Sequence, residues 1–226
     1  MFTMRRLLTL FFVIGLLASP VAVQRGSAAP PSQGGVACPV AGGARVVLDP
    51  GHGGSDSGAT ATLANGSVLR EKDLNLDVAN RAASFLTAQG VSVALTRYGD
   101  TALGNSERGD IANACGASVL VLIHFNASSD SAINYTKTFW GKKRKDLDFS
   151  THMNAALAAG ISGVANGGVG QFAHGALLQA TMPSTLAETV FLSNPAEAER
   201  LGDGTGARQR EIAAALAAGI ASWPGV

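Results

Sequence analysis

"VVLDPGHGGSDSGA", residues 46–59, joins a short apolar run to a turn that is crowded with glycine. The apolar residues predict a strand over residues 45–49, and the Pro-Gly-His-Gly-Gly that follows ends this strand. His52 therefore stands at the exit of a predicted strand. The glycines around His52 allow a sharp backbone bend and leave room for an ion or a substrate.

Downstream of this stretch, apolar runs alternate with helical patterns. The sequence predicts further strands over residues 91–97, 118–124, 136–140, 175–179 and 184–191. It predicts helices over residues 71–89, 106–115, 146–160 and 206–222. The glycine-rich residues 163–170 are expected to form a loop. This alternation predicts a single α/β domain, with a mostly parallel twisted sheet of about six strands and helices on both faces.

Residues 1–28 have the layout of a secretory signal peptide. Arg5 and Arg6 form a basic start, the apolar residues 7–18 follow, and small, turn-prone residues come next. We expect cleavage after Ala28. The apolar run is short for a membrane span, and an uncleaved anchor is the alternative. We therefore expect an exported protein of the periplasm, the cell wall or the medium, without a stable membrane anchor after cleavage.

The mature chain is expected to be near neutral. Loss of residues 1–28 removes three arginines and no acidic residue, so the formal net charge falls from +1 to −2. This balance does not favour nucleic acid as a partner. Residues 29–44 are rich in Pro, Gly and Ala and are expected to be a flexible segment before a single folded domain over residues 45–226. We expect that domain to be a monomer.

Cys38 and Cys115 are the two cysteines of the chain. An exported protein meets an oxidising compartment, so we expect the two to pair, with two free thiols as the alternative. Closing so long a loop stabilises a protein by about 4–5 kcal/mol in the chain-entropy model.

Four ionisable residues lie where a parallel sheet could gather them. His52, His124 and Glu188 stand at or near the carboxyl ends of predicted strands, where open parallel sheets bind ligands. Glu71 begins the first predicted helix. Two histidines and a carboxylate suffice for a catalytic zinc, and a further carboxylate can accept the proton of the attacking water. The alternatives are structural hydrogen bonding by the histidines and a favourable helix-start charge for Glu71.

Five segments carry a more specific signal: "VVLDPGHGGSDSGA", "REKDLNLDVANR", "VALTR", "SERGDIANACGASVLVLIHFNAS" and "MPSTLAETVFLSNPAEAERL". In this order they resemble the N-acetylmuramoyl-L-alanine amidases of the amidase_3 type, over residues 45–222. The resemblance implies that His52, Glu71 and His124 bind Zn²⁺ and that Glu188 is catalytic. It also implies hydrolysis of the amide between the lactyl group of N-acetylmuramic acid and the first L-alanine of the peptidoglycan stem peptide.

Some residues depart from the pattern of that family. Phe125 stands where a small residue is common, Gln179 where arginine is common, and Val190 where glycine is common. We expect all three near the mouth of the cleft, where they would affect substrate preference. Neither a wall-binding module nor a long occluding helix is evident, so we expect an open, standalone catalytic domain that holds the wall weakly and favours soluble fragments. The resemblance implies that the substrate is peptidoglycan or its muropeptide fragments. A zinc peptidase that cuts within the stem peptide and a non-catalytic peptidoglycan-binding protein are the alternative functions.

The remaining candidates have plainer interpretations beside the functional ones. His174 is expected to lie on the surface, and a place in the wall of the cleft is the alternative. Asp49, Arg97 and Arg108 are expected to form hydrogen bonds that support the scaffold. The basic run Lys142–Lys145 is expected to be a solvated loop, and attraction of anionic wall polymers is the alternative.

Overall fold

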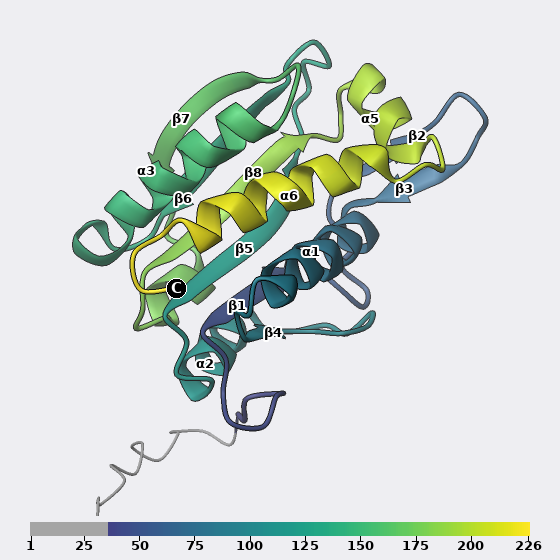
Figure 1. Cartoon of the computed structure of the whole chain (residues 1–226). Helices are drawn as coiled ribbons and strands as arrows, with labels where there is room; N and C mark the ends of the chain where they lie inside the picture. The colour runs from purple at the N-terminus through teal and green to yellow at the C-terminus, as the bar shows by residue number, and fades with distance from the viewer. Residues whose placement is uncertain (1–35) are drawn as a thin grey trace, which may run out of the picture. The chain divides into compact units, whose positions relative to one another are not determined.

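The computed structural model describes residues 36–226 (Figure 1). The expected signal peptide, residues 1–28, lies outside the described residues. Among residues 36–226, no helix is both long enough and apolar enough to cross a membrane.

A six-stranded sheet forms the centre of the domain. Its strands are β1 (Val46–Pro50), β4 (Val93–Leu95), β5 (Val119–Asn126), β6 (Tyr135–Trp140), β7 (Ala165–Gln171) and β8 (Ser184–Phe191). Their order across the sheet is β4-β1-β5-β8-β6-β7. The first four strands of this order run parallel, whereas β6 is antiparallel to β8 and parallel to β7. The predicted mostly parallel sheet is confirmed, and β2 (Thr60–Thr62) and β3 (Val68–Arg70) form a separate hairpin.

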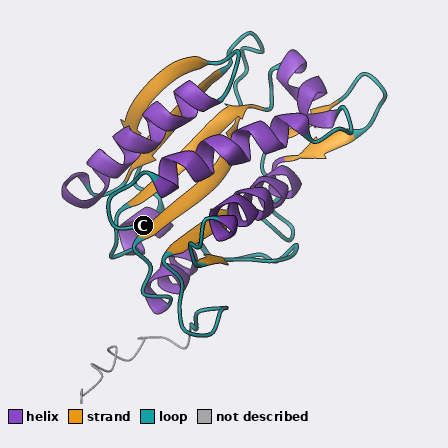
Figure 2. Cartoon of the chain, in the orientation of Figure 1, coloured by secondary structure: helices purple, strands orange, loops and turns teal. Residues whose placement is uncertain are grey.

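Helices cover both faces of the sheet, as predicted (Figure 1 and Figure 2). On one face, α1 (Glu71–Ala88), α3 (Lys143–Gly160) and α6 (Ala207–Ala221) enclose the larger hydrophobic core. On the other face, α2 (Asn105–Ala114) and α4 (Gly175–Gln179) enclose a smaller core. The last helix before α6 is α5 (Pro195–Gly202), which follows β8.

The central strands are buried on both faces, which explains their continuous apolar sequences. Leu120 and Leu122 of β5 belong to the smaller core, and the apolar residues between and around them belong to the larger one. Because side chains alternate along a strand, His124 lies on the α2 and α4 face, two residues after Leu122. Glu188 lies on the same face of β8, two residues after Leu186. The fold therefore presents both side chains on one face of adjacent strands.

Residues 175–179, predicted as a strand, form the short helix α4 instead. Periodicity alone cannot separate a helix from a strand in so short an apolar run. The ring of His174 caps the helix, since its Nδ1 accepts a hydrogen bond from the Ala176 N–H at 3.3 Å. Ala176 and Leu177 are fully buried in the core that α4 shares with α2. Packing against α2, rather than local preference, selects the helix.

Residues 163–170, predicted as a loop, contain most of the edge strand β7. Glycine weakens strands in general, but it also allows another group to approach the backbone closely. A Cβ at Gly170 would lie 2.8 Å from the Phe139 ring, and a Cβ at Gly167 would collide with the Tyr135 ring. The glycines of β7 thus make room for the aromatic side chains of its partner β6.

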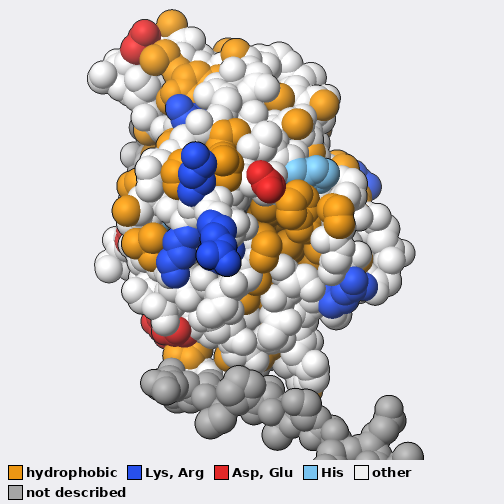
Figure 3. Space-filling view, turned by 90° about the vertical axis from the view of Figure 1, so that its left-hand side faces the viewer, with side chains coloured by type: hydrophobic (Ala, Val, Ile, Leu, Met, Phe, Trp, Pro, Cys, Tyr) orange, Lys and Arg blue, Asp and Glu red, His pale blue; other side chains and the backbone are white. Residues whose placement is uncertain are grey.

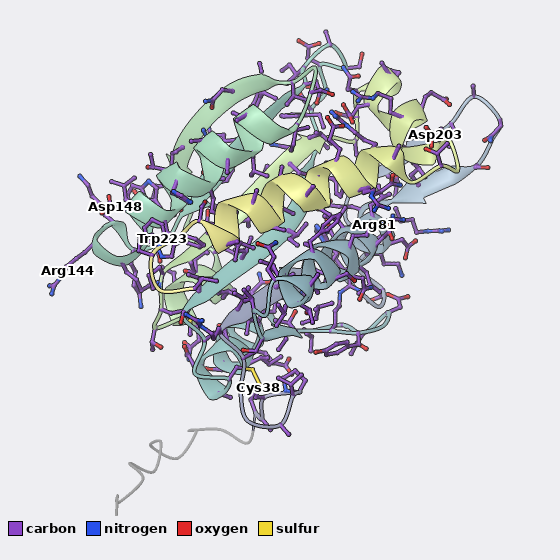
Figure 4. All side chains as sticks on the ribbon, viewed as in Figure 1. Cys38, Arg81, Arg144, Asp148, Asp203 and Trp223 are labelled. Carbon is purple, nitrogen blue, oxygen red and sulfur yellow. A yellow bond between two sulfur atoms is a disulfide. The ribbon has the colours of Figure 1, made fainter. Side chains whose placement is uncertain are left out.

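The basic run Lys142–Lys145 is not a loop, because α3 begins at Lys143. Lys142, Lys143 and Arg144 are exposed, and Arg144 points away from the domain in Figure 4. Lys145 is half-buried and forms an ion pair with Asp146. The expectation of solvated side chains therefore holds for three of these residues, while the expected backbone is wrong.

Cys38 and Cys115 form the expected disulfide, which joins the segment before β1 to the end of α2 (Figure 4). Cys115 is buried in the smaller core, and Val36 and Val40 pack against the same core. The described part of the segment before the domain, residues 36–44, is thereby held against it.

Candidate active site

His52 lies two residues after the end of β1 and has a φ of +60°, the one positive φ outside glycine in the described residues 36–226. This conformation is costly for a residue with a Cβ and persists where neighbouring contacts enforce it. The His52 carbonyl accepts a hydrogen bond from Arg108 Nη2 at 2.8 Å. Its ring Nδ1 lies 2.8 Å from Asp56 Oδ2, and its Nε2 lies 3.0 Å from Glu71 Oε1. The turn therefore aims Nε2 at Glu71.

Glu71, the first residue of α1, is buried between the two histidines. Its Oε1 lies 3.0 Å from His52 Nε2 and 3.0 Å from His124 Nδ1. Two backbone N–H groups hold the carboxylate: Ala59 donates to Oε2 at 2.8 Å, and Phe125 donates to Oε1 at 3.1 Å. These contacts fix both oxygens, so the side chain has little freedom to turn away.

His124 projects from β5 into space that a glycine leaves open. A Cβ at Gly51 would collide with the His124 ring, so only glycine permits this ring position. The rings of His52 and His124 are 4.9 Å apart between centroids. One ligand atom each from His52, Glu71 and His124 lie within 4.8 Å of one another, close enough to hold one metal ion. The three residues predicted as ligands are thus brought together.

The electrostatics of this cluster favour a protonated His52 and an ionised Glu71. Burial lowers the pKa of His52, but Glu71 and Asp56 outweigh burial and raise it to about 9. Burial also opposes ionisation of Glu71, yet the hydrogen bonds with His124 and His52 hold its pKa well below the usual range. A divalent cation would replace the proton between His52 Nε2 and Glu71 Oε1.

Glu188 lies beside His124, because these two residues are partners in the β5–β8 ladder. Its Oε2 is buried and has no hydrogen-bond partner among the described residues. Burial raises the pKa of its carboxyl to about 7, with a smaller contribution from Glu71. An unpartnered carboxyl with this pKa is suited to accept and return a proton near neutral pH.

The turn that carries His52 rests on a buried polar network. Arg108 Nη1 donates to Asp49 Oδ1 at 2.7 Å and to the Pro50 carbonyl at 2.9 Å. Arg97 donates to the same carbonyl at 2.9 Å and to the Gly51 carbonyl at 3.0 Å. The scaffold role predicted for Asp49, Arg97 and Arg108 is confirmed.

The four candidate residues open into one cavity of about 550 Å³. Other residues on its wall include Asp56, Arg108, Phe125, Phe172, His174 and Leu186. Figure 3 shows a face of the molecule on which hydrophobic side chains gather beside histidine and acidic side chains. The prediction placed the site beyond the strand ends. His52 does lie past the end of β1, whereas His124 and Glu188 lie within β5 and β8.

The three residues that depart from the family pattern do not share one location. Phe125 is among the residues around the cavity, but its side chain is buried in the larger core and does not reach the cleft mouth. Val190 is fully buried in the larger core, and Gln179 hydrogen-bonds to Asp110 at 2.6 Å on the outer side of α4 and α2. The expectation that all three lie at the cleft mouth is wrong.

Two cavity residues have roles that the sequence did not reveal. Asp56 orients the His52 ring, and its position four residues after His52 in the same turn was the available signal. His174 lines the cavity, the less favoured of its two interpretations. Burial, with a smaller contribution from nearby His124, lowers the pKa of His174 to about 4. The His174 ring is therefore neutral near pH 7.

A family model described as Amidase_3, N-acetylmuramoyl-L-alanine amidase, matches residues 46–222, from β1 through α6. The chain belongs to this amidase family. The recognised resemblance is thereby confirmed.

Individual relatives agree with this membership. The N-acetylmuramoyl-L-alanine amidase LytC of Bacillus subtilis is 34% identical over 162 residues, which are 70% of this chain and 32% of LytC. AmiA of Escherichia coli is 32% identical over 228 residues, which are 80% of this chain and 77% of AmiA. The chain thus spans about a third of the length of LytC and about three quarters of AmiA.

Solved structures of amidases share the fold. AmiC2 of Nostoc punctiforme superposes with a TM-score of 0.69 at 30% identity, covering 78% of this chain and 94% of that structure. An N-acetylmuramoyl-L-alanine amidase of Clostridium difficile 630 gives a TM-score of 0.71 at 29% identity, with coverage of 78% and 94%. The sheet and its helices are therefore those of an amidase catalytic domain.

Proposed function

We propose that the chain is a zinc-dependent amidase that hydrolyses the bond between N-acetylmuramic acid and L-alanine, in peptidoglycan or its muropeptide fragments. The observation that carries this proposal is the free, buried Oε2 of Glu188 beside His124, in the cavity where His52, Glu71 and His124 converge. Family membership supports the choice of amide, and the four side chains supply the chemistry that its hydrolysis needs.

The residues present fit a zinc ion. Two imidazoles and one carboxylate form a ligand set used by catalytic zinc, which keeps one position open. Asp56 accepts the Nδ1 proton of His52, which leaves Nε2 free as a ligand and fixes the orientation of the ring. The glycines at positions 51 and 58 leave the room that the His124 ring and the Glu71 carboxylate occupy. Zinc held there would polarise the scissile carbonyl and lower the pKa of a water.

Glu188 is proposed to move the proton. As the water oxygen bonds to the lactyl carbonyl carbon, Glu188 takes a proton from that water. As the carbon–nitrogen bond breaks, Glu188 gives the proton to the departing nitrogen of L-alanine. Its buried, unpartnered oxygen lets it hold the proton between the two steps. The products are a free lactyl carboxylate and a stem peptide with an L-alanine amino terminus.

The proposed place of action is outside the cytoplasm, where peptidoglycan lies. The signal-peptide layout of residues 1–28 supports export. After export the domain would act as a monomer without a membrane anchor.

A defined muramyl peptide tests the function. The purified mature protein is incubated with it, with and without a chelator and with zinc restored, and the products are weighed by mass spectrometry. Chelator-sensitive release of the intact stem peptide with an L-alanine amino terminus is expected. Cleavage elsewhere in the stem would indicate a zinc peptidase. Zinc binding without cleavage of the fragment or of whole sacculi would indicate a peptidoglycan-binding protein.

A further inference from the structure

His174 lies in the cavity, but the proposed proton transfer does not use it. It stands between β7 and α4, and its ring is 6.4 Å from the His124 ring and 5.8 Å from the Phe172 ring, measured between centroids. The side chain is only partly exposed and forms part of the cavity wall. The cap on α4 uses only Nδ1 of this ring, and Nε2 is left without an assigned role.

The hydrogen bond at the start of α4 determines which nitrogen of His174 carries the proton. Nδ1 accepts the Ala176 N–H at 3.3 Å, so in the neutral ring the proton resides on Nε2. Within residues 36–226, this Nε2–H has no hydrogen-bond acceptor. The cavity therefore contains one fixed N–H donor that is free to bind a ligand oxygen.

The same hydrogen bond argues against His174 as a further metal ligand. A ligating Nε2 would have to give up its proton, which would move that proton to the Nδ1 that already accepts from Ala176. In the described part of the chain, the group of residues able to share one ion consists of His52, Glu71 and His124 without His174. Hydrogen-bond donation is the chemistry left to its Nε2.

We propose that His174 Nε2–H donates a hydrogen bond to the carbonyl oxygen of the scissile amide as that oxygen becomes negatively charged. This inference rests on the proposed function. When the water oxygen bonds to the carbonyl carbon, the electron pair of the carbonyl double bond moves to its oxygen. His174 keeps its proton throughout, and the hydrogen bond weakens again when the carbonyl re-forms and the nitrogen leaves. A donor that acts on developing charge raises kcat more than it lowers KM.

Two amide substitutions separate this role from helix capping. In His174→Asn, the side-chain oxygen can still accept the Ala176 N–H, but no donor reaches the position of Nε2. In His174→Gln, the amide nitrogen can reach that position, but the cap is lost. The two variants therefore form a matched pair, each of which retains one function of the ring.

The expected result is a kcat about 10²-fold lower for His174→Asn, the size typical for loss of one such donor, with little change in KM. His174→Gln is expected to recover most of kcat, although its melting temperature is lower. Zinc content, measured by mass spectrometry of the metal, should equal that of the wild type in both variants. A phosphonamidate analogue of the tetrahedral intermediate should bind more weakly to His174→Asn, while the muramyl product binds equally well.

A capping role alone would reverse the order, with His174→Asn near wild type and His174→Gln impaired, and this result would overturn the proposal. Equal affinity of His174→Asn and wild type for the phosphonamidate would do the same. If wild-type protein leaves the muramyl amide intact, the proposed function itself fails. That failure is distinguishable, because it appears before any substitution is made.

Discussion

Glu188 and His124 are direct neighbours across the β5–β8 ladder, and Glu188 Oε2 is buried without a partner among the described residues. An unpaired polar atom at this depth is costly to folding, and such groups are retained where they serve a reaction. The candidate metal ligand His124 and the candidate proton acceptor Glu188 therefore lie side by side on adjacent strands. The first prediction follows from this relationship.

Glu188→Gln is expected to retain zinc and to lose about 10²–10⁴-fold in kcat, the usual contribution of a positioned acid–base group. The amide has nearly the shape of the carboxyl but cannot accept the water proton. Steady-state kinetics on a muramyl peptide, together with zinc analysis of the same sample, measure both effects. Turnover close to wild type would remove Glu188 from the mechanism.

The stability of the metal-free protein should reveal the same carboxyl through its pH dependence. Burial raises the pKa of Glu188 from 4.5 to about 7, so the folded state binds this proton more tightly than the unfolded chain. Its contribution to stability is therefore fully present at low pH and is lost as pH rises toward the folded-state pKa. Glu188→Gln should raise the urea midpoint at about pH 8 and change it little at about pH 4. An equal effect at both pH values would contradict the shift.

Asp56→Ala is expected to weaken zinc binding about 10- to 100-fold, because the His52 ring loses the acceptor that orients it. Competition with a chromophoric chelator measures the affinity. Asp203→Asn is a suitable control, since Asp203 is exposed and its side chain binds only Thr205 nearby. Unchanged affinity in Asp56→Ala would show that the turn alone orients His52.

Gly51→Ala is expected to abolish zinc binding, because the added Cβ would collide with the His124 ring. Gly99→Ala provides a matched control, since a Cβ at position 99 meets no atom within 4 Å. Zinc content and circular dichroism of both variants separate loss of the site from loss of the fold. A folded Gly51→Ala protein with full zinc would show that the ring has another place to sit.

Replacing Cys38 and Cys115 with serine is expected to lower the free energy of unfolding by about 4–5 kcal/mol, since the unfolded chain regains the freedom of a long loop. Urea unfolding of the oxidised wild type and the double variant measures the difference. The disulfide lies at the end of α2, away from the residues that line the cavity, so kcat should stay close to wild type.

Much of the fold could be predicted from local sequence. The apolar run of β5 and the periodic pattern of α1 leave few alternatives. A strand that is buried on both faces has a continuous apolar sequence, whereas a helix that is buried on one face has apolar residues at helical spacing. The short elements were harder to predict from local sequence. α4 became a helix through burial of Ala176 and Leu177 in the core shared with α2, and β7 became a strand because its glycines accommodate rings from β6. Neither partner is near in the sequence.

The sequence by itself determined the α/β class, the family and the four residues His52, Glu71, His124 and Glu188 as candidates, since residue types and segment order carry that information. Only the tertiary structure decided that His124 and Glu188 lie within their strands, that Asp56 orients His52, and that His174 presents an unpartnered N–H. The reason is physical. Chemical identity is local to each residue, whereas the direction of a ring and the partners of a proton depend on segments that meet only when the chain folds.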